Sequence, residues 1–234
     1  MGEKDVHNEN TDKYSLRGRV FTKIREDILA GRYKQNDELK EASIGQELGV
    51  SRTPVREALI ALNKIKLVEI YPQRGSYISL INHELVEEAR CIRLILETAI
   101  VEEACDRAGE KEMMELEENL KLQEVYQDSA NENKLLTLDN EFHEIFFKIC
   151  RKEFTYHLLN GMMTHFDRVR RLSLTVVKDS KILSDHRALA EAIKSHDKQA
   201  ARAVITKHLS RYELDEEALR KNYGEYFKKE STVI

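Results

Sequence analysis

Proline is absent from residue 73 to residue 234. Proline inside an α-helix removes a backbone hydrogen bond and clashes with the preceding turn, so its absence leaves long helices unbroken. The same stretch is rich in Leu, Glu, Lys and Ala, and Gly109, Asn131, Asp179 and Asp197 interrupt it at intervals. The expected helices are 83–108, 110–129, 132–150, 152–177, 181–196 and 198–220. Helices of this length with short connections predict an antiparallel all-α bundle.

The composition is that of a water-soluble protein. The 234 residues are 34% charged, and no apolar run approaches the roughly 18 residues that cross a membrane. Residues 1–13 are polar and acidic, without the apolar core of a signal peptide, so we expect a disordered lead-in. The three widely spaced cysteines, Cys91, Cys105 and Cys150, are expected to be buried free thiols in a reducing cytoplasm.

The charge is unevenly divided along the chain. Residues 14–80 contain 12 Lys or Arg and 8 Asp or Glu, whereas residues 81–234 contain 24 and 30. A basic segment at 14–80 before an acidic segment at 81–234 favours contact with nucleic acid through the first segment alone. We expect no membrane partner.

Three helices are expected before the proline-free stretch, at residues 15–30, 41–48 and 52–64. Gly31 is placed to end the first, and Gly49 makes the turn between the second and the third. Helix, turn and helix of these lengths form the geometry that places the last helix in the major groove of DNA.

The start of the third helix carries the residues expected to contact DNA. Ser51 is suited to cap the helix through its hydroxyl, and Pro54 is tolerated in the first turn. Arg52, Thr53 and Arg56 point away from the apolar stripe, and guanidinium groups suit phosphate oxygens and guanine. Taken alone, the stretch could equally be a surface helix with two solvated arginines.

Two short strands are expected next, at residues 67–70 and 77–80. The turn between them contains Arg74, which could reach a groove or a phosphate, and Gly75, which allows a close approach of the backbone. The hairpin is typical of the wing in a winged helix, and the alternative is a simple surface hairpin.

Four polar residues fall on the inward faces of the later helices. Asp139 and His143 are one helical turn apart, and His186 and His208 lie within the apolar stripes of two other helices. One carboxylate and three imidazoles suit a divalent metal ion. A single inward histidine is more often a hydrogen-bonded core residue, and spacing alone does not prove that the four meet.

The first part of the chain resembles the GntR family of bacterial transcription regulators over Val20 to Ser79. The resemblance is carried by ILAGRY at 28–33, SRTPVREAL at 51–59 and LVEIYPQRGSYIS at 67–79. It implies an N-terminal winged helix-turn-helix that binds double-stranded DNA.

The sequence departs from the pattern of that family in three places. The usual Pro-Gly before the second helix is replaced by Gln35, Asn36 and Asp37, and a usual glycine is Lys66. A common basic residue near the start of the second helix is Ala42, which puts one phosphate contact in doubt.

The helical part resembles the FCD (FadR-like) class of effector-binding domains. The motifs are LDNEFHEIFF at 138–147, SDHRALAEAI at 184–193 and ARAVITKHL at 201–209. The resemblance implies a metal ion (Zn, Ni or Mn, with Zn favoured) at the floor of a cavity that receives a small carboxylate effector. The ligands that it implies are Asp139, His143, His186 and His208.

Two further inward residues are candidates for the effector site. Arg93 could clamp the effector carboxylate, or it could form an internal salt bridge with Glu97 or another carboxylate. His165 faces inward and could line the cavity or support the metal ligands.

The expected protein is therefore a cytoplasmic, homodimeric transcription regulator. Its winged helix-turn-helix, residues 14–80, would bind a near-palindromic operator, and its helical domain, residues 82–222, would respond to the carboxylate; residues 223–234 would be a polar tail. One alternative is a DNA-binding metal sensor without an organic effector. A metal-dependent enzyme is less favoured, because no general base is clearly placed and the DNA-reading head would be unexplained.

Overall fold

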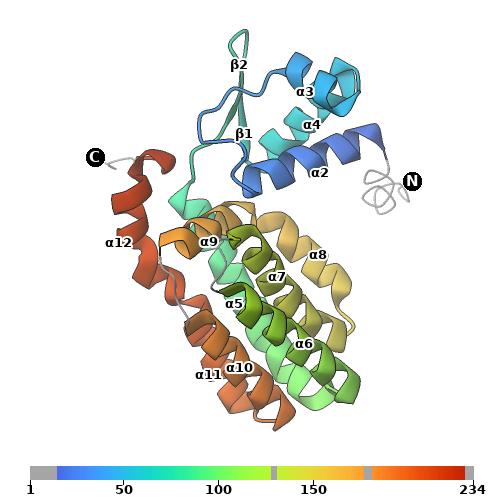
Figure 1. The fold of residues 1–234 in the computed structure, drawn as a ribbon, viewed down its shortest axis with the longest axis vertical. Coiled ribbons are helices and arrows are strands. Elements are labelled where there is room, and N and C mark those ends of the chain that lie inside the picture. Colours follow the sequence, from blue (N-terminus) through green and yellow to red (C-terminus); the bar gives the residue numbers. More distant parts are fainter. Residues whose placement is uncertain (1–14, 128–130, 177–180, 230–234) are drawn as a thin grey trace, which may run out of the picture. The chain divides into compact units, whose positions relative to one another are not determined.

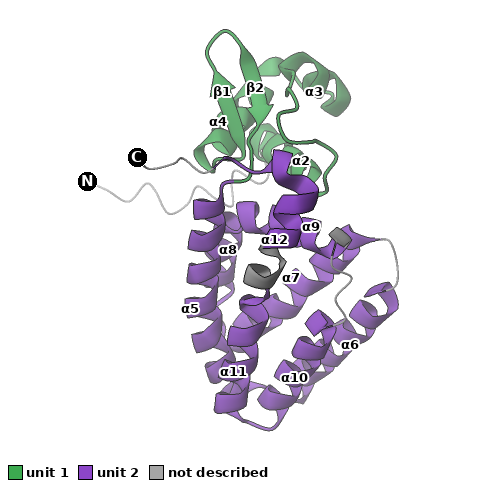
Figure 2. Cartoon of the chain, turned by 90° about the vertical axis from the view of Figure 1, so that its left-hand side faces the viewer, with its two compact units in different colours: residues 1–81 green, residues 82–234 purple. Residues whose placement is uncertain are grey.

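A computed structural model of the chain describes residues 15–127, 131–176 and 181–229. The chain divides into two compact units between Ile81 and Asn82, coloured separately in Figure 2. The predicted disordered lead-in, residues 1–13, lies outside the described residues.

The first unit has three helices and a two-stranded hairpin. Its elements are α2 (Leu16–Leu29), α3 (Glu41–Leu48), α4 (Arg52–Lys64), β1 (Val68–Tyr71) and β2 (Gly75–Ile78) (Figure 1). The strands are antiparallel, with Val68 opposite Ile78 and Tyr71 opposite Gly75. Apolar stripes of the helices meet in one core that includes Val20, Ile24, Ile44, Val55, Leu59 and Leu62. The predicted winged helix-turn-helix is confirmed, although β1 starts one residue later than expected and β2 two residues earlier.

Glycine is required twice in the helix-turn-helix. Gly49 has φ 64°, the left-handed conformation that ends α3. A Cβ on Gly45 would lie 2.8 Å from the carbonyl oxygen of Val50, so the turn passes over α3 only because Gly45 has no side chain.

The prediction that the Ser51 hydroxyl caps α4 is wrong. Ser51 occupies the N-cap position, but its side chain makes no capping hydrogen bond. An N-cap side chain usually accepts from the second or third residue of the helix, and Pro54, the third residue of α4, has no N–H to offer. Pro54 therefore fits the first turn at the expense of the cap.

Two residues that depart from the family pattern adopt left-handed backbone conformations. Lys66 has φ 63° and Asn36 has φ 65°. Asparagine tolerates this region, whereas a lysine there carries a steric cost that glycine would avoid.

The second unit is a bundle of helices. Its elements are α5 (His83–Arg107), α6 (Glu110–Gln127), α7 (Glu132–Ile149), α8 (Glu153–Met162), α9 (Thr164–Val176), α10 (Lys181–Lys194), α11 (Lys198–Leu209), α12 (Arg211–Tyr223) and the 3-10 turn η1 (Gly224–Tyr226). Helix α5 is central, because α7, α9, α10 and α11 all pack against it (Figure 1). The predicted all-α bundle is confirmed, and none of the described helices is long and apolar enough to cross a membrane.

Two predicted helices are each divided in two. The span 152–177 breaks at Met163, after Asn160 and Gly161, which are weak helix formers, and the hydroxyl of Thr164 donates to the Gly161 carbonyl. The span 198–220 breaks at Ser210, and nothing in the local sequence explains this second break.

The cysteine prediction is correct for two residues and wrong for the third. Cys105 and Cys150 are buried free thiols, and burial raises the pKa of Cys150 to about 11. Cys91 is exposed, because it lies on the outward face of α5, one turn before Ile95, which is 65% exposed.

The predicted polar tail is partly folded. Helix α12 runs to Tyr223, and Phe227 is only 5% exposed. The guanidinium carbon of Arg220 lies 5.6 Å from the centre of the Phe227 ring, so an aromatic residue holds this segment against α12. Residues 230–234 lie outside the described residues.

Candidate functional site

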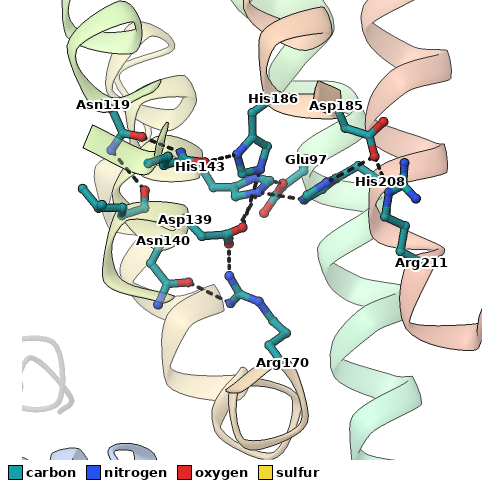
Figure 3. Close-up of polar contacts among 12 residues, drawn as sticks. Glu97, Asn119, Asp139, Asn140, His143, Arg170, Asp185, His186, His208 and Arg211 are labelled. Atoms are coloured by element: carbon teal, nitrogen blue, oxygen red, sulfur yellow. Dashed lines mark hydrogen bonds and ion pairs between the residues drawn. The ribbon is translucent and has the colours of Figure 1, made fainter. Parts of the chain in front are cut away.

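Four side chains from three helices meet inside the second unit (Figure 3). Asp139 and His143 come from α7, His186 from α10 and His208 from α11, so the structure brings together all four predicted metal ligands. One potential ligand atom from each lies within 4.8 Å of the others. The Nε2 atoms of His143 and His208 are 3.2 Å apart, and Asp139 Oδ1 is 3.5 Å from His186 Nε2.

Two of the three imidazoles are oriented by a close polar partner. Glu97 Oε2 lies 2.6 Å from His143 Nδ1, and Gln123 Oε1 lies 2.8 Å from His186 Nδ1. Gln123 in turn donates to Asn119 Oδ1 over 2.6 Å. A proton on Nδ1 would face the acceptor in each case and leave the Nε2 lone pair directed at the centre of the cluster.

The chemistry of the cluster fits a metal ion. Among the described residues, His186 Nε2 is buried and has no hydrogen-bond partner, which is costly for a polar atom. Burial lowers the pKa of His143, His186 and His208, and the neighbouring imidazoles lower that of His186 further. Neutral imidazoles and one carboxylate are the donor set that zinc and similar divalent ions use.

Arg93 forms the internal salt bridge that was one of its two expected roles. Its Nε donates to Glu97 Oε1 over 2.6 Å, and both side chains are buried. Burial by itself would raise the pKa of Glu97, but Arg93 and His143 outweigh it and bring the pKa to about 2. The Glu97 carboxylate therefore stays ionised between Arg93 and His143.

Arg170 was not expected from the sequence. It contacts Asp139 directly, and its Nη1 donates to Asp167 and to Asn140, each over 2.7 Å. Figure 3 shows it reaching the cluster from α9. The carboxylate of Asp139, a predicted metal ligand, is thus also paired with the Arg170 guanidinium.

A cavity of about 110 Å³ adjoins the cluster. Asp139 and His208 form part of its wall, together with three arginines, so the cluster and the guanidinium groups face one space. The residues that line it are Arg93, Gln123, Gln127, Leu135, Leu136, Asp139, Phe166, Arg170, Ser173, Leu174, Ile182, Leu183, His208, Leu209 and Arg211.

The sequence prediction of the cavity wall was incomplete. His165 is buried, but it is not among the described residues that line the cavity. Gln123, Arg170 and Arg211 were missed. Gln123 carried a signal, because Asn119 and Gln123 are polar residues one turn apart on a face that buries Leu116 and Leu120.

The predicted DNA-contacting residues of α4 are exposed. Ser51, Arg52 and Thr53 lie at its N-terminal end, and Arg56 follows one turn later. The Arg56 guanidinium donates to Glu41 through Nε over 2.9 Å and through Nη2 over 3.1 Å.

The tip of the hairpin carries the other two predicted residues. Arg74 is exposed, and its guanidinium carbon lies 5.6 Å from the centre of the Tyr71 ring. Gly75 has φ 115°, a conformation that other residues rarely adopt.

Comparison with known families covers most of the chain. Residues 16–78 match the family described as bacterial regulatory proteins, gntR family, and residues 88–211 match the FCD domain.

Relatives of similar length exist among curated proteins. The HTH-type transcriptional repressor RspR of Escherichia coli K12 is 27% identical over 212 residues, covering 90% of this chain and 93% of that protein. The gluconate operon transcriptional repressor of Bacillus subtilis is 26% identical over 192 residues, covering 80% and 79%. The solved structure of E. coli McbR/YncC has a TM-score of 0.75 at 18% identity, covering 89% of this chain and 99% of that one, and so shares the fold.

Proposed function

This chain belongs to the gntR family of bacterial regulatory proteins and carries an FCD domain, and on that premise we propose a homodimeric regulator controlled by a small carboxylate in a metal-containing cavity. The chain is a DNA-binding transcription regulator, and its families and relatives are regulators rather than enzymes.

The convergence of Asp139, His143, His186 and His208 is the observation that carries the metal proposal. Their donor atoms lie within 4.8 Å of one another, burial lowers the pKa of all three imidazoles, and His186 Nε2 has no hydrogen-bond partner among the described residues. Zinc is favoured by the ligand types, which also suit nickel or manganese. When bound, the ion supplies a positive charge and a Lewis acid that can accept a carboxylate oxygen.

The cavity supports a small carboxylate as the effector. Arg170 and Arg211 line it beside the metal ligands, and guanidinium groups bind carboxylates well. Its volume of about 110 Å³ suits a small ligand. One relative is named for a gluconate operon, and gluconate is itself a hydroxycarboxylate.

Elemental analysis and thermal-shift screening test this site together. Protein purified without chelators should contain or take up about one divalent ion per chain, and His143→Ala should lose it. His157→Ala, which alters an exposed histidine on α8, is the matched control and should keep the metal. A panel of small carboxylates should raise the melting temperature of the metal-loaded protein more than that of the metal-free protein. Absence of metal from the wild type would refute the site, and metal without any carboxylate response would favour the metal sensor.

An exposed apolar row on α8 supports the homodimer. Phe154, Leu158 and Met162 recur every four residues and are 67%, 49% and 50% exposed. We assign this row to contact with a second copy, because an exposed apolar row on one helix suits the self-complementary interface of a two-fold symmetric dimer. Phe154→Asp should give a monomer in sedimentation, whereas Val125→Asp, on an exposed position of α6, should not. A dimer that survives Phe154→Asp with unchanged affinity would rule out this surface.

Effector binding should change DNA affinity. Helix α5 begins two residues after Ile81 and carries Arg93 and Glu97 of the site, so one continuous element leads from the first unit into the cavity. A coupling of typical size changes affinity about 5- to 150-fold, and operator DNA must change effector affinity by the same factor. Titration of the effector with and without operator measures it, and equal affinities would show that the two sites are independent.

A further inference from the structure

The three imidazoles of the cluster are not held equally. His143 and His186 have polar partners 2.6 Å and 2.8 Å from their Nδ1 atoms. The Nδ1 atom of His208 is 3.9 Å from Asp185 Oδ2, which is too long for a hydrogen bond. Among the described residues, this buried nitrogen has no hydrogen-bond partner. His208 is therefore the imidazole of the cluster whose Nδ1 atom lies farthest from its nearby carboxyl or amide oxygen.

Asp185 is paired with two cations. Its Oδ2 accepts a close hydrogen bond from Arg211 Nε, and its Oδ1 accepts from Lys207 Nζ over 3.2 Å. Asp185 is only 3% exposed, so its carboxylate must remain paired. The Lys207 side chain is 68% exposed and weakly placed, whereas Arg211 is 14% exposed and lines the cavity.

We propose that Arg211 and His208 compete for Asp185, and that an anion in the cavity strengthens metal binding by drawing Arg211 away. Asp185 then accepts the Nδ1 proton of His208 in a hydrogen bond. That bond fixes the ring with Nε2 toward the cluster and makes it a better ligand, as outer carboxylates do for metal-bound histidines. The inference rests on the proposed metal site and adds cooperativity between anion and metal to it.

The local backbone permits this exchange. His208 and Arg211 are three residues apart but lie on different helices, because the chain breaks at Ser210. Arg211 is the first residue of α12, whereas His208 belongs to the last turn of α11. Figure 3 shows Asp185 between the two side chains, on the third helix, α10.

Zinc affinity, measured by competition with a chromogenic chelator on the full chain, tests the proposal without an effector. Arg211→Gln removes the competitor and should raise zinc affinity about tenfold, the lower end of outer-sphere effects. The gain should disappear in the double variant Asp185→Asn with Arg211→Gln. Arg211→Lys retains the cation, so its zinc affinity should stay near that of the wild type. If the double variant does not fold, the contrast between Arg211→Lys and Arg211→Gln still tests whether the cation competes for Asp185. Lys207→Gln, the control on the exposed partner, should change affinity less than about twofold.

The possible failures are distinguishable. No zinc binding by the wild type would overturn the metal site and this inference with it. Zinc binding that is unchanged or weaker in Arg211→Gln would overturn the inference alone, since a merely structural salt bridge predicts that result. A gain that persists in the double variant would exclude Asp185 as the positioning residue. Circular dichroism and melting of each metal-free variant establish that it is folded.

Discussion

Arg56 in the first unit and Arg93 in the second form similar ion pairs in opposite surroundings. Arg56 Nε lies 2.9 Å from Glu41, and Arg93 Nε lies 2.6 Å from Glu97. The Arg56 side chain is 68% exposed, whereas that of Arg93 is 5% exposed. In water such a pair is weak and exchangeable, but in the interior neither charge can be left without its partner. The exposed ion pair can therefore be exchanged for a contact between Arg56 and DNA. The buried ion pair fixes Arg93 within the core of the second unit.

The comparison also changes which arginines are expected to meet an effector. Arg93 is committed to Glu97, which in turn orients His143, so moving Arg93 would disturb the cluster. Arg170 and Arg211 are each 14% exposed and line the cavity, which makes them better suited to exchange a protein carboxylate for that of a ligand. Arg93 also lines the cavity, so its predicted contact with the effector stays a prediction beside its ion pair with Glu97.

The largest expected effect is on the buried pair. Glu97→Ala leaves Arg93 buried without its partner and should lower the free energy of unfolding by about 3–5 kcal/mol. Chemical denaturation of the metal-free protein measures this loss. Glu41→Ala is the matched control, because Arg56 regains water, and it should cause no measurable loss of stability. An equal loss of unfolding free energy in Glu97→Ala and Glu41→Ala would show that burial does not make one ion pair more important for stability than the other.

The next effect concerns DNA binding through the exposed arginines. Arg52→Ala and Arg56→Ala should each weaken binding to the specific operator roughly 5- to 150-fold, the range for losing a bidentate contact to a base. Fluorescence anisotropy with operator and scrambled DNA measures both affinity and specificity. Tight, sequence-specific binding by the double variant would contradict the assignment of α4 as the recognition helix.

The smallest expected effect is on operator affinity when the ion pair between Arg56 and Glu41 is removed. Glu41→Gln releases Arg56 and should tighten operator binding by less than about tenfold, since exposed ion pairs are weak. Glu57→Gln removes the same charge from an exposed position of α4 and controls for the general loss of negative charge. A larger gain in Glu57→Gln than in Glu41→Gln would mean that the ion pair does not restrain Arg56.

Local sequence signals predicted the first unit well because its turns are specified by single residues. Gly49 in a left-handed conformation and Pro54 in the first turn of α4 follow directly from backbone chemistry. The missing Ser51 cap has a chemical cause. Serine and proline each suit the start of a helix, but Pro54 removes one of the N–H groups that Ser51 would bind.

The site in the second unit depends on packing between helices that are distant in sequence. The spacing of Asp139 and His143 places both on one face, but their meeting with His186 and His208 depends on how α7, α10 and α11 pack. Arg170 was missed because an arginine in a basic run, beside Arg168 and Arg171, gives no periodic signal of burial. The break at Met163 was missed although Asn160 and Gly161 are weak helix formers, and the break at Ser210 has no local sequence signal.

The exposure of Cys91 provides a spectroscopic probe that is already part of the chain. Cys105 and Cys150 are buried, and burial raises the pKa of both thiols, so they react slowly with maleimides. A dye or spin label would therefore attach to Cys91 on α5, the helix that also carries Arg93 and Glu97, without any engineered cysteine. Its signal can follow metal or ligand binding in solution while every native residue of the site remains in place.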